Sequence, residues 1–209
     1  MSASESVDLL RVGFVPGVTL TKWRTRWAER VRARLEVGEV AADEARSLLD
    51  RGELDMCFVR LPVDREGLHA IALYDETMVA WVAKEHPIAA FDEITFADLA
   101  DETVLHEVTG VAIDRVNAGA VLLVPMSVAR SASRRDLVHR PVVDAEQATV
   151  TLTWLIDNEN PLIEEFIGIV RGRTANSSRT ARERAAAPKH TRAPDRSRSK
   201  PRFRGRRRR

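Results

Sequence analysis

The stretch at residues 10–27 (LRVGFVPGVTLTKWRTRW) constrains the fold most, because its hydrophobic period changes at one point. Residues 9–15 form an almost continuous apolar run with Arg11 as the only charge, which is typical of a strand buried on both faces of a parallel sheet. Pro16-Gly17 interrupts the run, and apolar residues then recur at helical spacing opposite a basic face. These helical positions are Leu20, Trp23, Trp27 and Val31. The stretch therefore predicts a strand, a tight loop and a helix, with the two tryptophans in the core.

The same alternation of strand and helix continues after this unit. Residues 33–40 predict a second strand, residues 41–51 a helix that Gly52 caps, and residues 53–62 a third strand centred on an apolar run. Two successive βαβ units imply right-handed crossovers and a parallel sheet. The fold class is therefore α/β.

Further elements follow along the chain. Ile71 and Leu73 are expected to lead into a turn. Strands are expected at residues 78–83, 103–105 and 149–156, and short helices at residues 91–102 and 106–120. Asn160-Pro161 predicts the start of a last helix, with an apolar stripe that ends at Gly172.

The net charge of +2 conceals a strong asymmetry along the chain. Residues 176–209 hold 14 basic and 2 acidic residues, a local charge of +12, which leaves −10 for the rest of the chain. The segment 175–209 consists mainly of Arg, Ser, Ala and Pro, a composition that predicts a disordered tail. Residues 1–8 are expected to be disordered as well.

The basic tail predicts nonspecific binding to nucleic acid, DNA or RNA, through phosphate contacts. The predicted nucleic-acid-binding residues are Arg198, Lys200, Arg202, Arg204, Arg206, Arg207, Arg208 and Arg209. Two alternatives stay open: a solvated tail without a partner, and an arm that folds back onto the acidic body.

The sequence lacks the motifs that are typical of several classes of function. The single cysteine, Cys57, excludes an internal disulfide, and its place in an apolar strand predicts a small buried hydrophobic residue. The five histidines show no metal-ligand spacing, and GxSxG, P-loop and GxGxxG motifs are absent. We therefore expect no catalytic residues, no metal and no cofactor. A polar N-terminus and the absence of a long apolar span predict a cytoplasmic protein without membrane contact.

The loop after the first strand is the candidate ligand site, since ligands of open α/β sheets bind at the carboxyl ends of strands. The predicted ligand-binding residues are Val15, Pro16, Gly17, Thr19, Arg60 and Leu61. Arg60 follows the third strand and is expected to pair with a carboxylate of the ligand. The alternatives are an ordinary turn with a threonine cap and a solvated surface arginine.

A series of short motifs, in this order, resembles the effector-binding domain of LysR-type transcription regulators. They are LRVGFVPG, Gly52-Glu53-Leu54-Asp55, His86-Pro87-Ile88-Ala89, Asp98-Leu99-Ala100, AGAVLLVPMSVAR at residues 118–130 and a strand at residues 136–141. The resemblance covers residues 9–173 and assigns residues 9–174 to one such domain. It implies a type 2 periplasmic-binding-protein-like fold, in which two α/β lobes are joined by two crossover strands and a small-molecule effector lies between them. It is also compatible with a homodimer.

The chain departs from this family in two places. LysR-type regulators carry a helix-turn-helix and a linker helix before the effector domain, whereas nine residues precede Leu10 here, so we expect a chain without that DNA-reading element. Between Leu105 and Val121 the family has a few tens of residues, whereas this chain has room for one short helix. We therefore expect a shortened second lobe.

Three functions are compatible with these observations. The first is a non-enzymatic effector sensor in transcription regulation whose basic tail binds nucleic acid. The second is a nucleic-acid- or ribosome-associated protein whose α/β body is an interaction scaffold without a ligand. The third is a cytoplasmic solute-binding protein.

Overall fold

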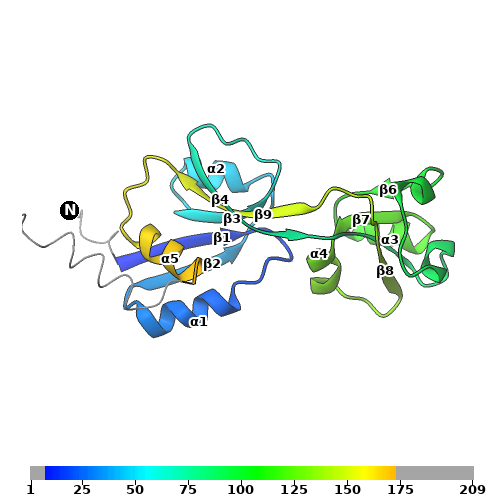
Figure 1. Cartoon of the computed structure of the whole chain (residues 1–209), viewed down its shortest axis with the longest axis horizontal. Coiled ribbons are helices and arrows are strands. Elements are labelled where there is room, and N and C mark those ends of the chain that lie inside the picture. The colour runs from blue at the N-terminus through cyan, green and yellow to red at the C-terminus, as the bar shows by residue number, and fades with distance from the viewer. Residues whose placement is uncertain (1–7, 173–209) are drawn as a thin grey trace, which may run out of the picture. The chain divides into compact units, whose positions relative to one another are not determined.

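The computed structural model describes residues 8–172, which form two lobes, each built on its own β-sheet (Figure 1). The lobes confirm the predicted two-lobed α/β fold. The expectations for residues 1–7 and for the basic tail, including its eight predicted nucleic-acid-binding residues, lie outside the described residues.

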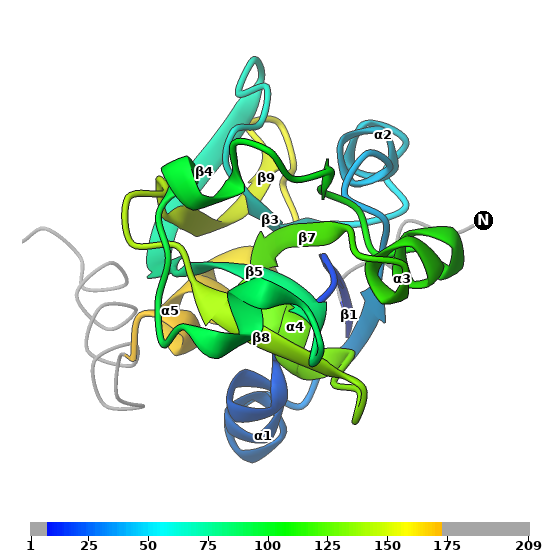
Figure 2. The ribbon, with the colours of Figure 1, turned by 90° about the vertical axis from the view of Figure 1, so that its right-hand side faces the viewer.

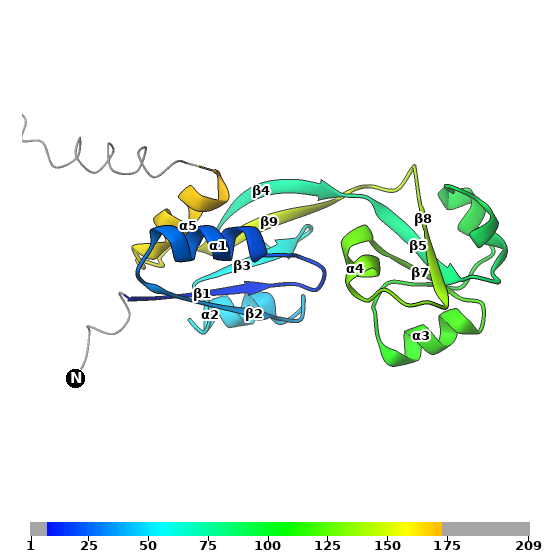
Figure 3. The ribbon, with the colours of Figure 1, turned by 90° about the horizontal axis from the view of Figure 1, so that it is seen from below.

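Lobe 1 contains a five-stranded sheet in the order β2-β1-β3-β9-β4. Strands β1, β2 and β3 are parallel, and β9 runs antiparallel to both of its neighbours. Helices α1 and α5 cover one face and α2 the other (Figure 3). The bounds are β1 Leu9–Phe14, α1 Thr21–Arg30, β2 Arg34–Glu39, α2 Ala45–Asp50, β3 Met56–Arg60, β4 Leu68–Glu76, β9 Ala148–Leu155 and α5 Leu162–Val170.

The core of lobe 1 confirms the periodicity of the first unit. Leu10 and Val12 of β1 are fully buried, and Trp27 of α1 is 3% exposed. The ring of Trp23 stacks on Phe58, with ring centroids 4.8 Å apart. Both tryptophans therefore pack helix α1 onto the sheet.

An ion pair between Arg11 and Asp55 joins β1 to the residue that directly precedes β3. Asp55, which is 5% exposed, accepts hydrogen bonds from the Arg11 backbone N–H at 2.7 Å and from Nε of the same arginine at 3.2 Å. This aspartate ends the Gly52-Glu53-Leu54-Asp55 motif, so the motif has a structural role: it fixes the entry of β3 beside β1.

Three expectations for lobe 1 need correction. Residues 68–76 do not lead into a turn but form the long strand β4, which pairs with β9 along its length. Helix α2 begins at Ala45, four residues later than expected, because residues 42–44 form a turn. The sheet is mixed and not purely parallel, because β9 and β4 return antiparallel from the second lobe.

Lobe 2 contains a four-stranded sheet in the order β6-β7-β5-β8. Strand β5 pairs antiparallel with β7 and β8, and the short β6 pairs parallel with β7. The view in Figure 2 shows α3, α4 and the strands of this lobe in front. The bounds are β5 Met78–Ala83, β6 Val104–Leu105, α3 Gly110–Asn117, β7 Val121–Pro125, α4 Met126–Ser131 and β8 Leu137–Pro141, with 3-10 helices η2 Pro87–Ala90 and η3 Phe96–Leu99.

The single short helix expected between Leu105 and Val121 is confirmed as the eight-residue α3. The helix expected at residues 91–102 is smaller than predicted. It is the four-residue η3, which a capping box of Thr95 and Asp98 opens. The lobes are connected by Thr77 between β4 and β5 and by residues 142–147 between β8 and β9, which confirms the two crossovers.

Replacing Thr151 by valine is expected to stabilise the protein. Thr151 of β9 is fully buried and its hydroxyl has no hydrogen-bond partner among the described residues. Valine has the same shape without the unsatisfied hydroxyl, so the free energy of unfolding should rise by about 1 kcal/mol. Urea denaturation measures the change.

Thr153→Val is the matched control on the same strand. The Thr153 hydroxyl is equally buried but donates to the Cys57 carbonyl at 3.1 Å. This substitution should lower the free energy of unfolding by about 1 kcal/mol. Equal effects of the two substitutions would contradict the assignment of the unsatisfied hydroxyl.

Candidate functional site

Arg60, the last residue of β3, lies where the two lobes meet. Its Nε donates to a Glu76 carboxylate oxygen at 2.7 Å and its Nη1 to the Pro16 carbonyl at 2.8 Å. Its Nη2 donates to the Ser127 hydroxyl at 3.0 Å. Pro16 belongs to lobe 1 and Ser127 to helix α4 of lobe 2, so one guanidinium binds both lobes.

The topology of lobe 1 explains this position. Strands β1 and β3 are parallel neighbours, so the loop after β1 and the end of β3 meet at one edge of the sheet. Glu76 is the last residue of β4 and reaches the same edge from the crossover. The side chains of Arg60 and Glu76 are only 15% and 7% exposed, which makes the interaction stronger than that of a surface ion pair.

The loop after β1 also contacts lobe 2 through its backbone. Gly17 has a φ of +85°, and a Cβ at this position would lie 2.8 Å from both the Ser127 hydroxyl oxygen and the Val128 backbone nitrogen. A side chain here would force the loop away from α4. Glycine therefore permits the close approach of the two lobes at the site.

The structure brings together three of the six predicted ligand residues: Pro16, Gly17 and Arg60. Val15 is 1% exposed and belongs to the core, and Thr19 is exposed. The backbone N–H of Leu61 donates to the Thr149 carbonyl at 3.0 Å, so this residue extends the sheet. The alternative of a solvated surface arginine is wrong for Arg60, because its side chain is largely buried and ion-paired.

A small cavity adjoins the site below helix α2. Its volume is about 140 Å³, and Val15, Val59 and Arg60 contribute to its wall. A drug-sized ligand needs a larger space. In this arrangement of the lobes, the cavity therefore adds little space for a ligand beside Arg60.

Two titratable groups of lobe 1, Tyr74 and Cys57, have a raised pKa. Burial raises the pKa of Tyr74, Glu76 raises it further and Arg60 opposes the shift. The phenol is thus neutral at physiological pH. Burial raises the pKa of Cys57 to about 12, which is the behaviour of a buried structural thiol. Within residues 8–172 no group of three or more His, Cys, Asp or Glu side chains could hold a metal ion.

Two residues of the site, Glu76 and Ser127, are missing from the sequence-based prediction. Ser127 lies within the AGAVLLVPMSVAR motif, whose turn carries it to the lobe boundary. Glu76 ends an alternating strand that the sequence analysis takes for the approach to a turn. The family motif was a usable signal for Ser127, whereas the role of Glu76 depends on the crossover.

Comparison with known families decides the assignment of this fold and site. The LysR substrate binding domain matches residues 4–117, more than half of the chain. The chain belongs to this family. As a member, it is related to the effector-sensing domains of transcriptional regulators, and the predicted resemblance is confirmed.

Individual relatives agree with the family assignment. The chain is 23% identical over 202 residues to the HTH-type transcriptional regulator AlsR of Bacillus subtilis (strain 168), covering 77% of this chain and 65% of AlsR. It is 34% identical over 113 residues to the HTH-type transcriptional regulator MetR of Escherichia coli (strain K12), covering 53% of this chain and 35% of MetR. The chain thus spans less than two thirds of the curated relatives it matches.

A solved structure shows the same fold. The BenM effector binding domain with its effector benzoate superposes with a TM-score of 0.66 at 18% identity, covering 87% of this chain and 96% of that chain. Among residues 8–172, no helix is long and apolar enough to cross a bilayer.

Proposed function

We propose that this chain is a non-enzymatic sensor of a small carboxylate effector in transcription regulation, and that Arg60 is the residue that recognises the carboxylate. The observation that carries the proposal is the Arg60 guanidinium, which donates to acceptors from both lobes. A cytoplasmic location, where both effector and genome are accessible, is part of the proposal.

The chemistry of Arg60 suits this role. Its Nη1 and Nη2 donate to a neutral carbonyl and a neutral hydroxyl, whereas its Nε is paired with the charged Glu76. A carboxylate is a stronger acceptor than either neutral group and binds a guanidinium through two parallel hydrogen bonds. An effector carboxylate could therefore replace Pro16 and Ser127 while Glu76 holds the arginine in place.

Such an exchange would couple effector binding to the contact between the lobes. Ser127 lies in the first turn of helix α4, so release of its hydroxyl breaks the side-chain hydrogen bond that joins Arg60 to lobe 2. A ligand shifts a conformational equilibrium only by its differential affinity for the two states. Here the difference in affinity between the two states would come from the Arg60–Ser127 hydrogen bond, which the effector carboxylate replaces.

The first experiment measures thermal stability with benzoate and with its uncharged analogue benzamide. A ligand at a hundred times its dissociation constant adds about 2.7 kcal/mol to the free energy of unfolding. We expect a rise in Tm with benzoate or another small carboxylate, none with the matching amide, and no rise in Arg60→Lys. Arg24→Lys, at an exposed position of α1, is the matched control. A panel of carboxylates without any effect would contradict the proposal.

We further propose that residues 175–209 bind nucleic acid nonspecifically. The support is the local charge of +12 on residues 176–209, since Lys and Arg that neutralise phosphates release counterions. The second candidate function, a nucleic-acid- or ribosome-associated scaffold, depends on this segment alone. In that case the α/β body would contact proteins without sensing a ligand.

The test compares duplex DNA and RNA binding by the full chain and by residues 1–175, each at low and near-physiological salt. We expect only the full chain to bind, with an affinity that falls steeply as salt rises. Nucleic-acid binding that is insensitive to salt, or that survives removal of residues 176–209, would show that the tail is not the segment that binds nucleic acid. Carboxylate binding without nucleic-acid binding would favour the solute-binding alternative.

A further inference from the structure

The outer face of helix α1 in lobe 1 is strongly basic. Residues 22–34, which cover α1 and the start of β2, hold six basic side chains and one acidic side chain, a local charge of +5. This concentration stands out, because residues 1–175 as a whole carry a charge of −10. The six basic residues are Lys22, Arg24, Arg26, Arg30, Arg32 and Arg34.

The packing of α1 leaves these side chains accessible. Trp27 is 3% exposed and Trp23 stacks on Phe58, so this side of the helix lies on the sheet. Lys22 and Arg24 are exposed, and so is Arg32 in the connection to β2. Figure 1 shows no labelled element on the outer side of α1. A partner can therefore reach the basic face.

Most of these cations have no anionic partner inside the molecule. Arg34 pairs with Glu36 at 2.7 Å. Four other side chains make no hydrogen bond or ion pair with any of residues 8–172: Lys22, Arg24, Arg26 and Arg32. Their charges are balanced only by solvent and counterions.

The charge pattern does not help the helix to fold. Lys22 and Arg26 are four residues apart, a spacing at which like charges destabilise a helix. The first turn contains no acidic residue, although one would interact favourably with the helix dipole there, and it contains Lys22 instead. A pattern that opposes local stability and has no internal partner indicates a function outside the fold. The function that suits it is binding of a polyanion.

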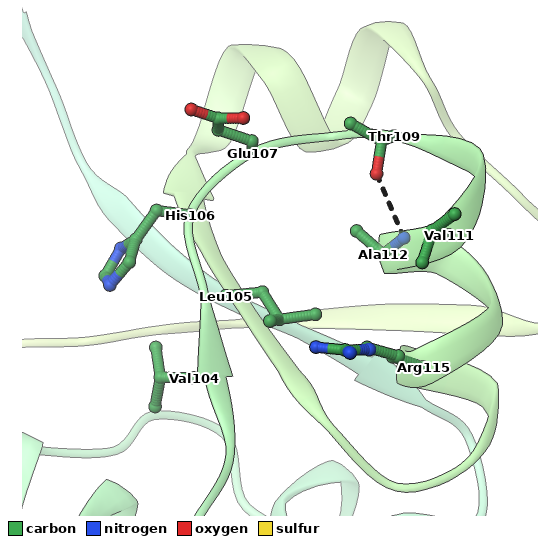
Figure 4. A pocket seen from close by; sticks show the side chains of 8 residues that line it. All are labelled: Val104, Leu105, His106, Glu107, Thr109, Val111, Ala112 and Arg115. Carbon is green, nitrogen blue, oxygen red and sulfur yellow. Dashed lines mark hydrogen bonds between the residues drawn. The ribbon is translucent and has the colours of Figure 1, made fainter.

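The groove in lobe 2 differs from α1 in its charges. It has a volume of about 400 Å³ and lies between strand β6 and helix α3. Figure 4 shows Arg115 and Glu107 on the walls of this groove, so a cation and an anion line the same surface. A polyanion gains less net attraction there than on the four like charges beside α1.

We propose that the basic face of α1 binds the phosphate backbone of duplex DNA. The helix has ten residues and is about 15 Å long. One strand of DNA presents a phosphate about every 3.4 Å along the duplex axis, so α1 spans about as many phosphates as it has cations without partners. The short side chains of Thr25 and Ala28 are exposed on the helix and allow the backbone to approach closely.

This contact rests on the proposed function, in which residues 175–209 bind nucleic acid. A few phosphate contacts on an otherwise acidic body are too weak to retain DNA alone. The tail raises the concentration of DNA near the body, and α1 then adds affinity without having to capture the DNA itself. Duplex DNA is the partner that a role in transcription regulation requires.

The test measures duplex DNA binding by the full chain, by fluorescence anisotropy, from low to near-physiological salt. The variant is Lys22→Gln/Arg24→Gln/Arg32→Gln, because glutamine removes the charge but keeps a long side chain and a good helix propensity. We expect the slope of log K against log salt concentration to become shallower by about three, which corresponds to three lost phosphate contacts. The affinity at low salt should fall by about tenfold or more.

Arg65→Gln/Lys84→Gln/Arg135→Gln is the matched control, because it makes the same change in net charge at exposed positions outside α1. Its affinity and its salt slope should stay close to the original values. Thermal unfolding shows whether the α1 variant is folded. Its Tm should not fall, because loss of the Lys22 charge removes the repulsion from Arg26.

Three results would overturn the proposal. Equal losses of affinity in the two triple variants would show that net charge alone matters. Equally strong competition by poly-glutamate of the same charge would show a general anion surface and not a DNA contact. An unchanged salt slope in the α1 variant, with binding abolished by removal of residues 176–209, would exclude the α1 contact and leave the tail proposal intact, whereas a full chain that binds no DNA would contradict both.

Discussion

Replacing Asp55 by alanine is expected to lower the free energy of unfolding by about 2–3 kcal/mol. The carboxylate is buried and accepts from the backbone N–H and from two side-chain nitrogens of Arg11. Its removal leaves a backbone donor of β1 and a guanidinium without their partner. The Arg11 side chain is 38% exposed and can regain water, which keeps the loss below that of a fully buried pair. Urea denaturation measures it.

Asp50→Ala provides the matched control in the same lobe. Asp50 pairs with Arg46 at 2.9 Å on helix α2, but these side chains are 46% and 33% exposed. An exposed pair four residues apart on a helix contributes only about 0.3–0.5 kcal/mol. If Asp55→Ala lowered the free energy of unfolding by as little as Asp50→Ala, the Asp55 carboxylate would not be what fixes β3 beside β1.

Replacing Arg60 by alanine is expected to cost about 3 kcal/mol of stability as well as the response to carboxylates. Glu76, whose side chain is 7% exposed, would be left as a buried charge without its cation. The Pro16 carbonyl and the Ser127 hydroxyl lose their donor in the same step. Thermal and urea unfolding measure the stability, and a benzoate titration measures the response.

A double variant separates the ion pair from the other contacts of Arg60. Adding Glu76→Gln to Arg60→Ala removes the uncompensated charge, so part of the lost stability should return while the carboxylate response stays absent. Arg134→Ala is the control, because Arg134 and Asp136 form an ion pair with both side chains 46% exposed; its effect should stay below about 1 kcal/mol. If the double variant were less stable than Arg60→Ala, the buried charge would not be the cause.

The local pattern of the sequence predicts the elements that bury a regular face. The first unit is the clearest case, because its apolar run and its helical stripe both depend on spacing along the chain, and the structure places them as β1 and α1. The last helix is another: the side chain of Asn160 accepts from the Leu162 backbone N–H, and the apolar stripe that follows is buried. The order of short motifs was sufficient to identify the family, since those motifs fix turns and strand entries.

Contacts between segments that lie far apart in the chain could not be predicted from the sequence. Strand β4 looked like the approach to a turn because four of its nine residues are exposed, and it becomes a strand only by pairing with β9, which lies far along the chain. The role of Arg60 was predicted as a ligand contact, but its bonds to Glu76 and Ser127 require two crossovers and the start of α4.

The sequence alone thus determined most of the secondary-structure units, the family, the single short helix between Leu105 and Val121 and the uneven distribution of charge. These properties depend on residue order and spacing, which a chain carries before it folds. Only the tertiary structure decided which side chains meet at the lobe boundary. Their meeting depends on how segments far apart in the chain pair and cross, and local periodicity contains no information about that pairing.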